Sequence, residues 1–489
     1  MTAGDRGNSR RASIAVDLGA ESCRVSLLRW HGSEPVVALV HRFANAPYER
    51  DGHLRWDWKS IEDGVEHGLR LCAEAATEGV ASIGVDGWAV DYVRVDGDGK
   101  ALDDPFCYRD ARTIESERRL HQVISADRLR QLTGVQRMRI NTLYQLYADR
   151  TPSGQRWLNL PEYLLSRWGG EPVAEYTNAS HTQMLDLHTA EWAREIFTAA
   201  GIDFAQALPV VPPGTDLGRL AGDLAGLPAL RETRLIAPAC HDTASAIAGI
   251  PATGTDWAYI SSGTWSLVGT LLEQPRNDAA AAEDNFTNLG AVGGRICFHK
   301  NVNGMWLIKQ CMKTWKAAGR PWEIAALVQA AEAVDRSLGA PAELLDIDQE
   351  PLLLAGDMPY LINAQRISRG LEPLNESPEN APEFAHLIFH SLAARYAEVL
   401  RRVEIHSGKT LKRLFVVGGA SRNAFLNRLT ARATGLQLIC GSAESSTVGN
   451  FAVQLAVLAG QRDPISGAHA EQVVRWAELL CGVPEVLSS

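Results

Sequence analysis

The stretch IAVDLGAESCRVSLL, residues 14–28, decides the fold that the sequence predicts. Two apolar runs flank a short polar turn around Gly19, a pattern typical of two strands joined by a tight turn. A second stretch of this kind, WAYISSGTWSLV at 257–268, places Gly263 in its turn, 244 residues after Gly19 in a chain of 489 residues. Two similar hairpins half a chain apart indicate an internally duplicated α/β protein with two related lobes.

The turns of both hairpins are suited to binding phosphate groups. Backbone N–H groups in such Ser- and Gly-containing turns are free to bind phosphate oxygens. Asp17 ends the first strand, and we expect it to hold a hydrated Mg²⁺, which favours a few carboxylate and phosphate oxygens. The alternative interpretation of Asp17 is a turn aspartate that caps a loop.

Two further segments add chemistry to the hairpins. The sequence LFVVGGASRN at 414–423 predicts a buried strand that enters a glycine turn, followed by a helix at 424–433. Glycines at such a turn allow close approach of the backbone to a ligand. The segment HDTAS at 241–245 places a carboxylate, Asp242, shortly before the second hairpin. A base beside a phosphate-binding turn suggests transfer of a phosphoryl group to a hydroxyl, although Asp242 could also be a helix N-cap.

Composition excludes several classes of protein. With 48 basic and 58 acidic residues the net charge is −10, which argues against a nucleic-acid surface. No apolar run reaches the length of a transmembrane helix, and Asp17 interrupts what would be the apolar part of a signal peptide. The eight cysteines include no C-x-x-C pair, so we expect reduced, mostly buried thiols in a cytoplasmic protein.

The spacing of apolar residues predicts a layout for each lobe. We expect a flexible tail at 1–12, an N-terminal domain at 13–250, a C-terminal domain at 251–465 and an extension at 466–489. The expected elements are strands at 13–18, 23–30, 35–43 and 81–86, a helix at 60–77, a loop at 86–92, a largely helical insertion at 120–214, a surface loop at 371–383 and a long helix at 383–405.

The order of these motifs resembles the FGGY family of sugar kinases. It comprises the Asp17 loop, Gly84-Val-Asp-Gly-Trp88, HDTAS, SSGTWS and the turn at 418–423. The segments NTLYQL at 141–146 and EYTNA at 175–179 resemble the branch that acts on L-rhamnulose, and YRDAR at 108–112, KNVNGMW at 300–306 and STVGN at 446–450 support it. The resemblance implies two ribonuclease-H-like (actin-like ATPase) domains facing each other across a nucleotide and sugar cleft. It further implies ATP- and Mg²⁺-dependent phosphorylation of L-rhamnulose at O1, giving L-rhamnulose 1-phosphate and ADP.

The resemblance also assigns roles to residues. Asp242 is the expected general base. The expected substrate-binding residues are Ala89, His241, Asp242, Thr243 and Asn301. The expected nucleotide-binding residues are Ala20, Glu21, Ser22, Cys23, Arg24, Thr264, Lys309 and Gly419. Asp17 is the expected metal ligand. Small-molecule partners, a ketose and ATP, are expected, without nucleic acid or membrane.

Three positions depart from the family pattern and keep alternatives open. Cys23 and Ala89 stand where glycine is usual, and Lys309 replaces glutamine. A thiol among backbone N–H groups beside Arg24 would be reactive if exposed, whereas the alternative is a buried, inert thiol. A methyl group at Ala89 would reshape the sugar pocket. The alternative functions are a kinase for another ketose, such as L-fuculose or D- or L-xylulose, and a nonenzymatic actin-like sugar sensor.

Overall fold

The computed structural model describes residues 11–149, 155–463, 466–482 and 485–487, and it divides into two units. The first unit contains the chain up to Thr253, together with Leu271–Phe298 and Ser445–Gly482. The second contains Gly254–Thr270, His299–Glu444 and the end of the chain. Most of the tail expected at 1–12 lies outside the described residues.

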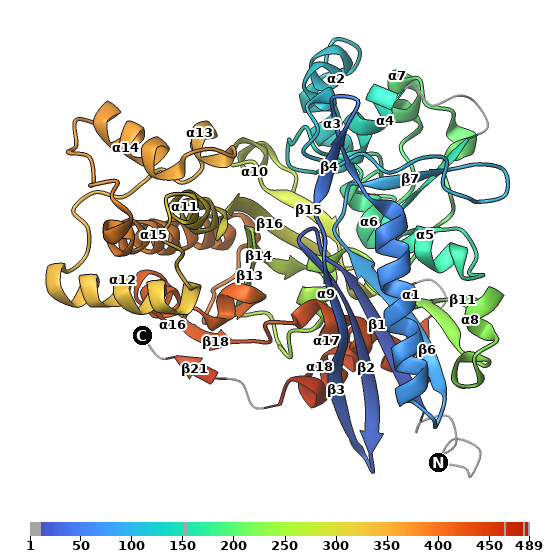
Figure 1. The fold of residues 1–489 in the computed structure, drawn as a ribbon. Coiled ribbons are helices and arrows are strands. Elements are labelled where there is room, and N and C mark those ends of the chain that lie inside the picture. Colours follow the sequence, from blue (N-terminus) through green and yellow to red (C-terminus); the bar gives the residue numbers. More distant parts are fainter. Residues whose placement is uncertain (1–10, 150–154, 464–465, 483–484, 488–489) are drawn as a thin grey trace. The chain divides into compact units, whose positions relative to one another are not determined.

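A mixed sheet forms the centre of the first unit, in the order β11-β12-β6-β1-β2-β3. Strand β1 is antiparallel to β2 and parallel to β6 (Figure 1). Strand β6 is in turn parallel to β12. The strands of this sheet are β1 (Ala12–Leu18), β2 (Ser22–His31), β3 (Glu34–Ala44), β6 (Val80–Gly87), β11 (Thr215–Arg219) and β12 (Arg234–Ala237). The helices of the unit are α1 (Trp58–Ala75), α2 (Arg112–Leu120), α3 (Ala126–Thr133), α4 (Thr142–Asp149), α5 (Leu160–Arg167), α6 (Tyr176–His181), α7 (Arg194–Ala200), α8 (Gly222–Ala225), α9 (Asp242–Ala248), α10 (Ala279–Glu283), α17 (Ser445–Leu458) and α18 (Ala470–Cys481).

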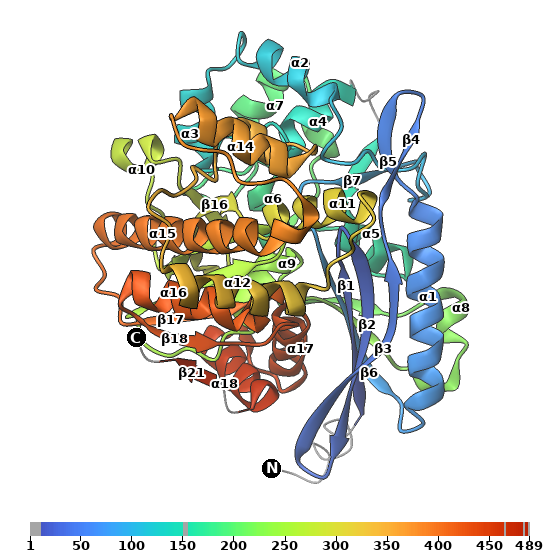
Figure 2. The same ribbon diagram turned by 60° about the vertical axis from the view of Figure 1, so that its left-hand side comes forward.

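Strand β1 is buried along its whole length because helices cover both faces of the sheet. Side chains alternate between the two faces of a strand. Ile14, Val16 and Leu18 therefore join the core that includes helix α1. Ala15 points the other way and packs with Phe451 of α17. Figure 2 shows α1 and α17 on opposite faces of the sheet.

The second unit repeats this design. Its strands follow the order β16-β14-β13-β17-β18-β21 within a sheet of seven described strands, whose remaining member is β15 (Thr287–Gly290). Strand β13 is antiparallel to β14 and parallel to β17. The strands are β13 (Trp257–Ser262), β14 (Trp265–Leu272), β16 (Ile296–Asn303), β17 (Arg413–Val417), β18 (Gln437–Cys440) and β21 (Glu485–Leu487). The helices are α11 (Trp306–Ala317), α12 (Ile324–Leu338), α13 (Glu350–Leu353), α14 (Met358–Ser368), α15 (Ala381–Ser407) and α16 (Ala424–Thr434).

Five strands have the same order in both sheets. They are β3, β2, β1, β6 and β12 in the first sheet and β16, β14, β13, β17 and β18 in the second, with the same directions wherever both pairings are described. This correspondence confirms the duplicated α/β architecture predicted from the two hairpins. Within the described part of the chain, no helix has both the length and the apolar character needed to cross a membrane.

Candidate active site

Three aspartates of the first unit lie close together, near the ends of β1 and β6 and at the start of α9. Asp17 lies near the end of β1 and Asp86 near the end of β6, and the two are direct register partners in the parallel pair. Asp242 is the first residue of α9, directly after His241, which bridges to Gly87 of β6. The Gly87 N–H also donates to the Cys240 carbonyl at 2.9 Å. The fold therefore brings together three carboxyl groups that are far apart in the sequence.

Side chains from β2 and α17 hold two of these carboxyl groups. Arg24 Nη1 donates to Asp17 Oδ2 at 2.9 Å, and Ser446 Oγ donates to the same oxygen at 2.7 Å. Asn450 Nδ2 donates to Asp86 Oδ2 at 2.6 Å. The other oxygen of Asp86 is buried and has no hydrogen-bond partner among the described residues.

Helix α17 supplies these contacts from a single face. Ser446, Asn450 and Gln454 follow one another at four-residue spacing, which aligns side chains along a helix. Gln454 Nε2 donates to Asn450 Oδ1 at 2.7 Å and to the Ile14 carbonyl at 3.0 Å. Asp86 and these α17 residues were absent from the site predicted from the sequence. The four-residue polar spacing was the available signal, but it does not identify the partner strand.

Burial and mutual repulsion alter the acidity of the aspartates. Desolvation, followed by the negative charge of Asp17, raises the pKa of Asp86 well above its ordinary value. The same two causes raise the pKa of Asp242 to about 7. The Asp242 side chain is 37% exposed, so its carboxyl group can be reached by a substrate. Such a carboxyl is suited to accept a proton near neutral pH.

Asp242 occupies the first turn of α9 and is not its N-cap. The N-cap position belongs to His241, whose side chain makes no capping hydrogen bond. The alternative interpretation of Asp242 as the capping residue is therefore wrong by one position. A negative charge in the first turn still interacts favourably with the helix dipole. His241 Nε2 lies 3.5 Å from Asp242 Oδ1, and Thr243 Oγ1 donates to that oxygen at 3.2 Å, so the three predicted residues lie together.

Helices α9 and α17 cross at unusually close range. A Cβ atom on Gly449 would overlap the Ser245 carbonyl oxygen and lie 2.8 Å from the Gly249 nitrogen. Across this contact, Ser245 Oγ donates to the Ser446 carbonyl at 2.9 Å and Ser445 Oγ donates to the Ala246 carbonyl at 2.7 Å. The crossing thus links the helix that begins at Asp242 to the helix that holds Asp17 and Asp86.

The loop after β6 contains a strained residue. Val90, next to the buried Ala89, has φ 69°, a left-handed conformation that is rare for a β-branched residue. Two residues of the NTLYQL segment bind its carbonyl: Thr142 Oγ1 donates at 2.8 Å and Gln145 Nε2 at 3.2 Å. Strain of this kind persists only where the surroundings impose it. NTLYQL therefore fixes the shape of the loop that carries Ala89.

The EYTNA segment supports the other side of the site. Glu175 Oε2 accepts from the Cys240 N–H at 3.0 Å, and Thr177 Oγ1 accepts from the His241 N–H at 3.0 Å. Burial raises the pKa of Glu175 to about 8 and that of Glu162 to about 7. These contacts fix the backbone immediately before Asp242.

The turn between β1 and β2 contains Ala20 and Glu21, with Ser22, Cys23 and Arg24 at the start of β2. The expectation of a reactive thiol at Cys23 is wrong. Cys23 faces the apolar core because it alternates with Ser22 and Arg24 along β2, and it is fully buried. Burial raises the pKa of the thiol to about 12, so a thiolate is disfavoured.

In the second unit, three of the predicted nucleotide residues lie on neighbouring segments: Thr264 in the β13–β14 turn, Lys309 on α11 and Gly419 in the turn after β17. Lys309 Nζ donates to Thr264 Oγ1 at 3.4 Å, and the Trp306 N–H of α11 donates to the Thr264 carbonyl at 3.1 Å. A Cβ on Gly418, beside the exposed Gly419, would lie 2.8 Å from the Ser262 carbonyl oxygen, so the two glycine turns adjoin. Asn301 lies on β16.

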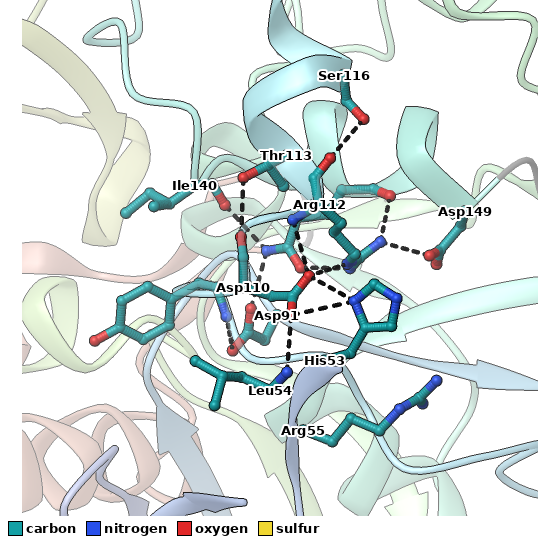
Figure 3. A network of polar contacts seen from close by, with 12 residues as sticks. His53, Leu54, Arg55, Asp91, Asp110, Arg112, Thr113, Ser116, Ile140 and Asp149 are labelled. Atoms are coloured by element: carbon teal, nitrogen blue, oxygen red, sulfur yellow. Dashed lines mark hydrogen bonds and ion pairs between the residues drawn. The ribbon is translucent and has the colours of Figure 1, made fainter. Parts of the chain in front are cut away.

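A separate cavity of about 510 Å³ in the first unit is lined by none of the predicted site residues. Arg112 of the YRDAR segment lines this cavity, and Asp110 of the same segment belongs to the polar network around it (Figure 3). Asp110 accepts from the Leu54 N–H at 2.8 Å and from the Arg112 N–H at 2.9 Å, while Arg112 pairs with Asp149. Asp91, drawn in the same view, accepts from the indole N–H groups of Trp56 and Trp88 at 2.7 and 2.9 Å. These contacts give YRDAR a structural role.

Two domains of a known protein family match this chain. Residues 12–249 match the N-terminal domain of the FGGY family of carbohydrate kinases, and residues 258–458 match its C-terminal domain. A rhamnulokinase of Enterococcus faecalis is 34% identical over 462 residues, covering 93% of this chain and 91% of that protein. A rhamnulokinase of Bacteroides thetaiotaomicron is also 34% identical, covering 93% and 92%.

Solved structures agree on the fold. A ligand-bound xylulose kinase from Lactobacillus acidophilus has a TM-score of 0.73 at 16% identity and covers 96% of each chain. A Plasmodium falciparum glycerol kinase with ADP has a TM-score of 0.70 at 12% identity, covering 97% of this chain and 93% of that one.

Proposed function

The chain belongs to the FGGY family of carbohydrate kinases, and we propose that it phosphorylates L-rhamnulose at O1 with ATP, giving L-rhamnulose 1-phosphate and ADP. The matches to rhamnulokinases over more than 90% of the chain support this choice of sugar. Membership of a kinase family makes the chain an enzyme, and no observation favours the nonenzymatic sensor. The observation that carries the mechanism is the group formed by Asp17, Asp86 and Asp242.

Asp242 is the general base in this proposal. Its carboxyl group is partly exposed, begins a helix and has a pKa raised to about 7. The O1 hydroxyl of the ketose transfers its proton to Asp242 as its oxygen forms a bond to the γ-phosphorus. The bond between that phosphorus and the bridging oxygen breaks, and ADP leaves with the electron pair. General-base assistance of this kind contributes about 10²–10⁴ in rate.

The neighbouring residues keep Asp242 in place. Glu175 and Thr177 hold the backbone at Cys240 and His241, and the crossing with α17 holds the helix that follows. His241, Thr243 and Asn301 are the proposed sugar contacts, with Ala89 on the constrained loop. The proposed nucleotide contacts are Ala20, Glu21, Ser22, Arg24, Thr264, Lys309 and Gly419. Cys23 can contribute only its backbone, because its side chain faces the apolar core.

The aspartate group also fits Mg²⁺. Asp17 and Asp86 are adjacent carboxyl groups, and one oxygen of Asp86 is buried with no hydrogen-bond partner in the described part of the chain. Arg24 pairs with Asp17, and the charge of Asp17 helps to raise the pKa of both Asp86 and Asp242. A bound cation would relieve this repulsion. Carboxylate oxygens are ligands that Mg²⁺ prefers. When bound, Mg²⁺ would neutralise phosphate charge. Asp17 would hold the ion, with Asp86 beside Asp17.

An ADP-release assay with a panel of ketoses tests the proposal. We expect L-rhamnulose to give the highest kcat/KM, with lower activity on L-fuculose or L-xylulose. Efficient turnover of another ketose without turnover of L-rhamnulose would refute the sugar assignment and leave the family membership intact.

A second experiment tests the base. Asp242→Asn keeps the size of the side chain but cannot accept the proton, so turnover should fall at least ~10²-fold while thermal stability and ATP binding stay near those of the wild type. Thr243→Ser, which keeps a hydroxyl group beside Asp242, is the matched control and should retain most of the activity. Near-normal turnover by Asp242→Asn would contradict the assigned role.

A further inference from the structure

Two histidines and an aspartate form a cluster in the second unit that the proposed reaction does not use. His386 and His390 lie one turn apart on α15, and Asp335 lies on α12, which packs against α15. His390 Nε2 lies 2.7 Å from Asp335 Oδ1, and His386 Nε2 lies 3.2 Å from the same oxygen. The potential ligand atoms of the three residues all lie within 4.8 Å of one another.

This arrangement has the dimensions of a transition-metal site. Ligand atoms at about 2.0–2.1 Å from a tetrahedral Zn²⁺ are separated from one another by about 3.3 Å. The distance of 3.2 Å from His386 Nε2 to the carboxylate oxygen is close to that value, whereas the distance of 2.7 Å from His390 Nε2 is shorter by more than half an ångström. Histidines four residues apart on a helix point in the same direction, so one ion can bind both. Small rotations of the side chains would complete the geometry.

The two imidazole rings face the carboxylate from the same helix. Their centroids lie 4.7 Å apart and the rings are tilted by 71° to each other. Both rings direct Nε2 to a single oxygen of Asp335, and His386 is buried. The three potential ligand atoms therefore converge on one place, where a single ion can contact all of them.

We propose that Asp335, His386 and His390 bind one divalent transition-metal ion, with Zn²⁺ as the best fit. Two imidazoles and one carboxylate suit Zn²⁺, whereas Mg²⁺ prefers oxygen ligands. The side chains of Asp335 and His390 are 18% and 13% exposed, so the ion can enter from solvent and keep a water molecule as its fourth ligand. The ion would join α12 to α15 and stabilise the second unit.

Metal titration of the full chain tests the proposal. The protein is first freed of metal with a chelator, and excess Mg²⁺ is then added to occupy sites made of carboxylates alone. Zn²⁺ binding is measured by calorimetry, and Co²⁺ is used as a spectroscopic probe of coordination by nitrogen. We expect one ion per chain, a rise in melting temperature with Zn²⁺, and binding at least about tenfold weaker in His386→Ala, His390→Ala and Asp335→Asn.

Two further variants separate metal binding from a purely structural role. His390→Gln can still donate a hydrogen bond to Asp335, so it should keep the metal-free melting temperature but lose metal affinity. His31→Ala removes an exposed histidine at the end of β2 and should bind Zn²⁺ like the wild type. Absence of Zn²⁺ binding by the wild type, or equal affinity in wild type and His390→Gln, would overturn the proposal.

Discussion

Substitution of Gly449 by alanine should destabilise the first unit strongly. The new Cβ would overlap the Ser245 carbonyl oxygen and lie 2.7 Å from its carbonyl carbon, where carbon atoms normally stay about 3.5–4.0 Å apart. Helices α9 and α17 must therefore separate by roughly 1 Å. Overpacking of this kind costs about 1–3 kcal/mol. The two hydrogen bonds across the crossing contribute about 1 kcal/mol each, so we expect a total loss of about 3–5 kcal/mol.

Thermal unfolding measures this loss. At about 2 °C per kcal/mol for a unit of this size, the melting temperature of Gly449→Ala should fall by about 6–10 °C. Turnover should fall as well, because α9 begins at Asp242. Gly97→Ala is the matched control, since its Cβ would meet nothing within 4 Å and its backbone is not left-handed. If Gly449→Ala and Gly97→Ala melted together at the temperature of the wild type, the reasoning about the crossing would be refuted.

Three further predictions concern the site. Because protonated Asp242 cannot accept a proton, kcat/KM for the ketose should fall as the pH drops below about 7; a profile that stays flat down to pH ~5 would contradict the raised pKa. Ala89→Gly should raise kcat/KM for L-rhamnulose several-fold, since one methyl group is worth about 1–3 kcal/mol in such a pocket. If the ratios of kcat/KM between ketoses in a panel assay did not change, the methyl group of Ala89 would not line the sugar pocket. Cys23 should resist maleimide in the native protein and react only after unfolding, as peptide mapping would show, whereas labelling at native pH would contradict its burial.

The sequence predicted these helices and strands well, because the residue patterns that indicate each one lie within the element itself. Apolar runs around Gly19 and Gly263 correctly indicated the hairpins β1–β2 and β13–β14. The helix expected at 60–77 is α1, and the one expected at 383–405 is α15, which is slightly longer at both ends. The burial of Cys23 was also readable, because it alternates with Arg24 and shares its face of β2 with Val25.

The sequence could not show the contacts that organise the aspartates. Ser446 reaches Asp17 across 429 positions, and Asn450 reaches Asp86 across 364 positions, so no local pattern pairs them. Asp86 was recognised within a motif, but its role depends on the parallel pairing of β1 with β6. The strain at Val90 was hidden for a similar reason, because the residues that impose it lie on α4. The roles of the site residues stay predictions until the variants are measured.

The correspondence between the two sheets separates a repeated part of the architecture from a variable part. Five strands, β1, β2, β3, β6 and β12, appear in the same chain order as β13, β14, β16, β17 and β18. Outside these five strands the sheets differ: β11 precedes β12, whereas β21 follows β18, although each pairs antiparallel with its neighbour. The second sheet also contains β15, which has no counterpart next to β3 among the described residues. The repeated unit of the architecture is therefore a five-stranded sheet, and the strands outside it are connected differently in the two halves.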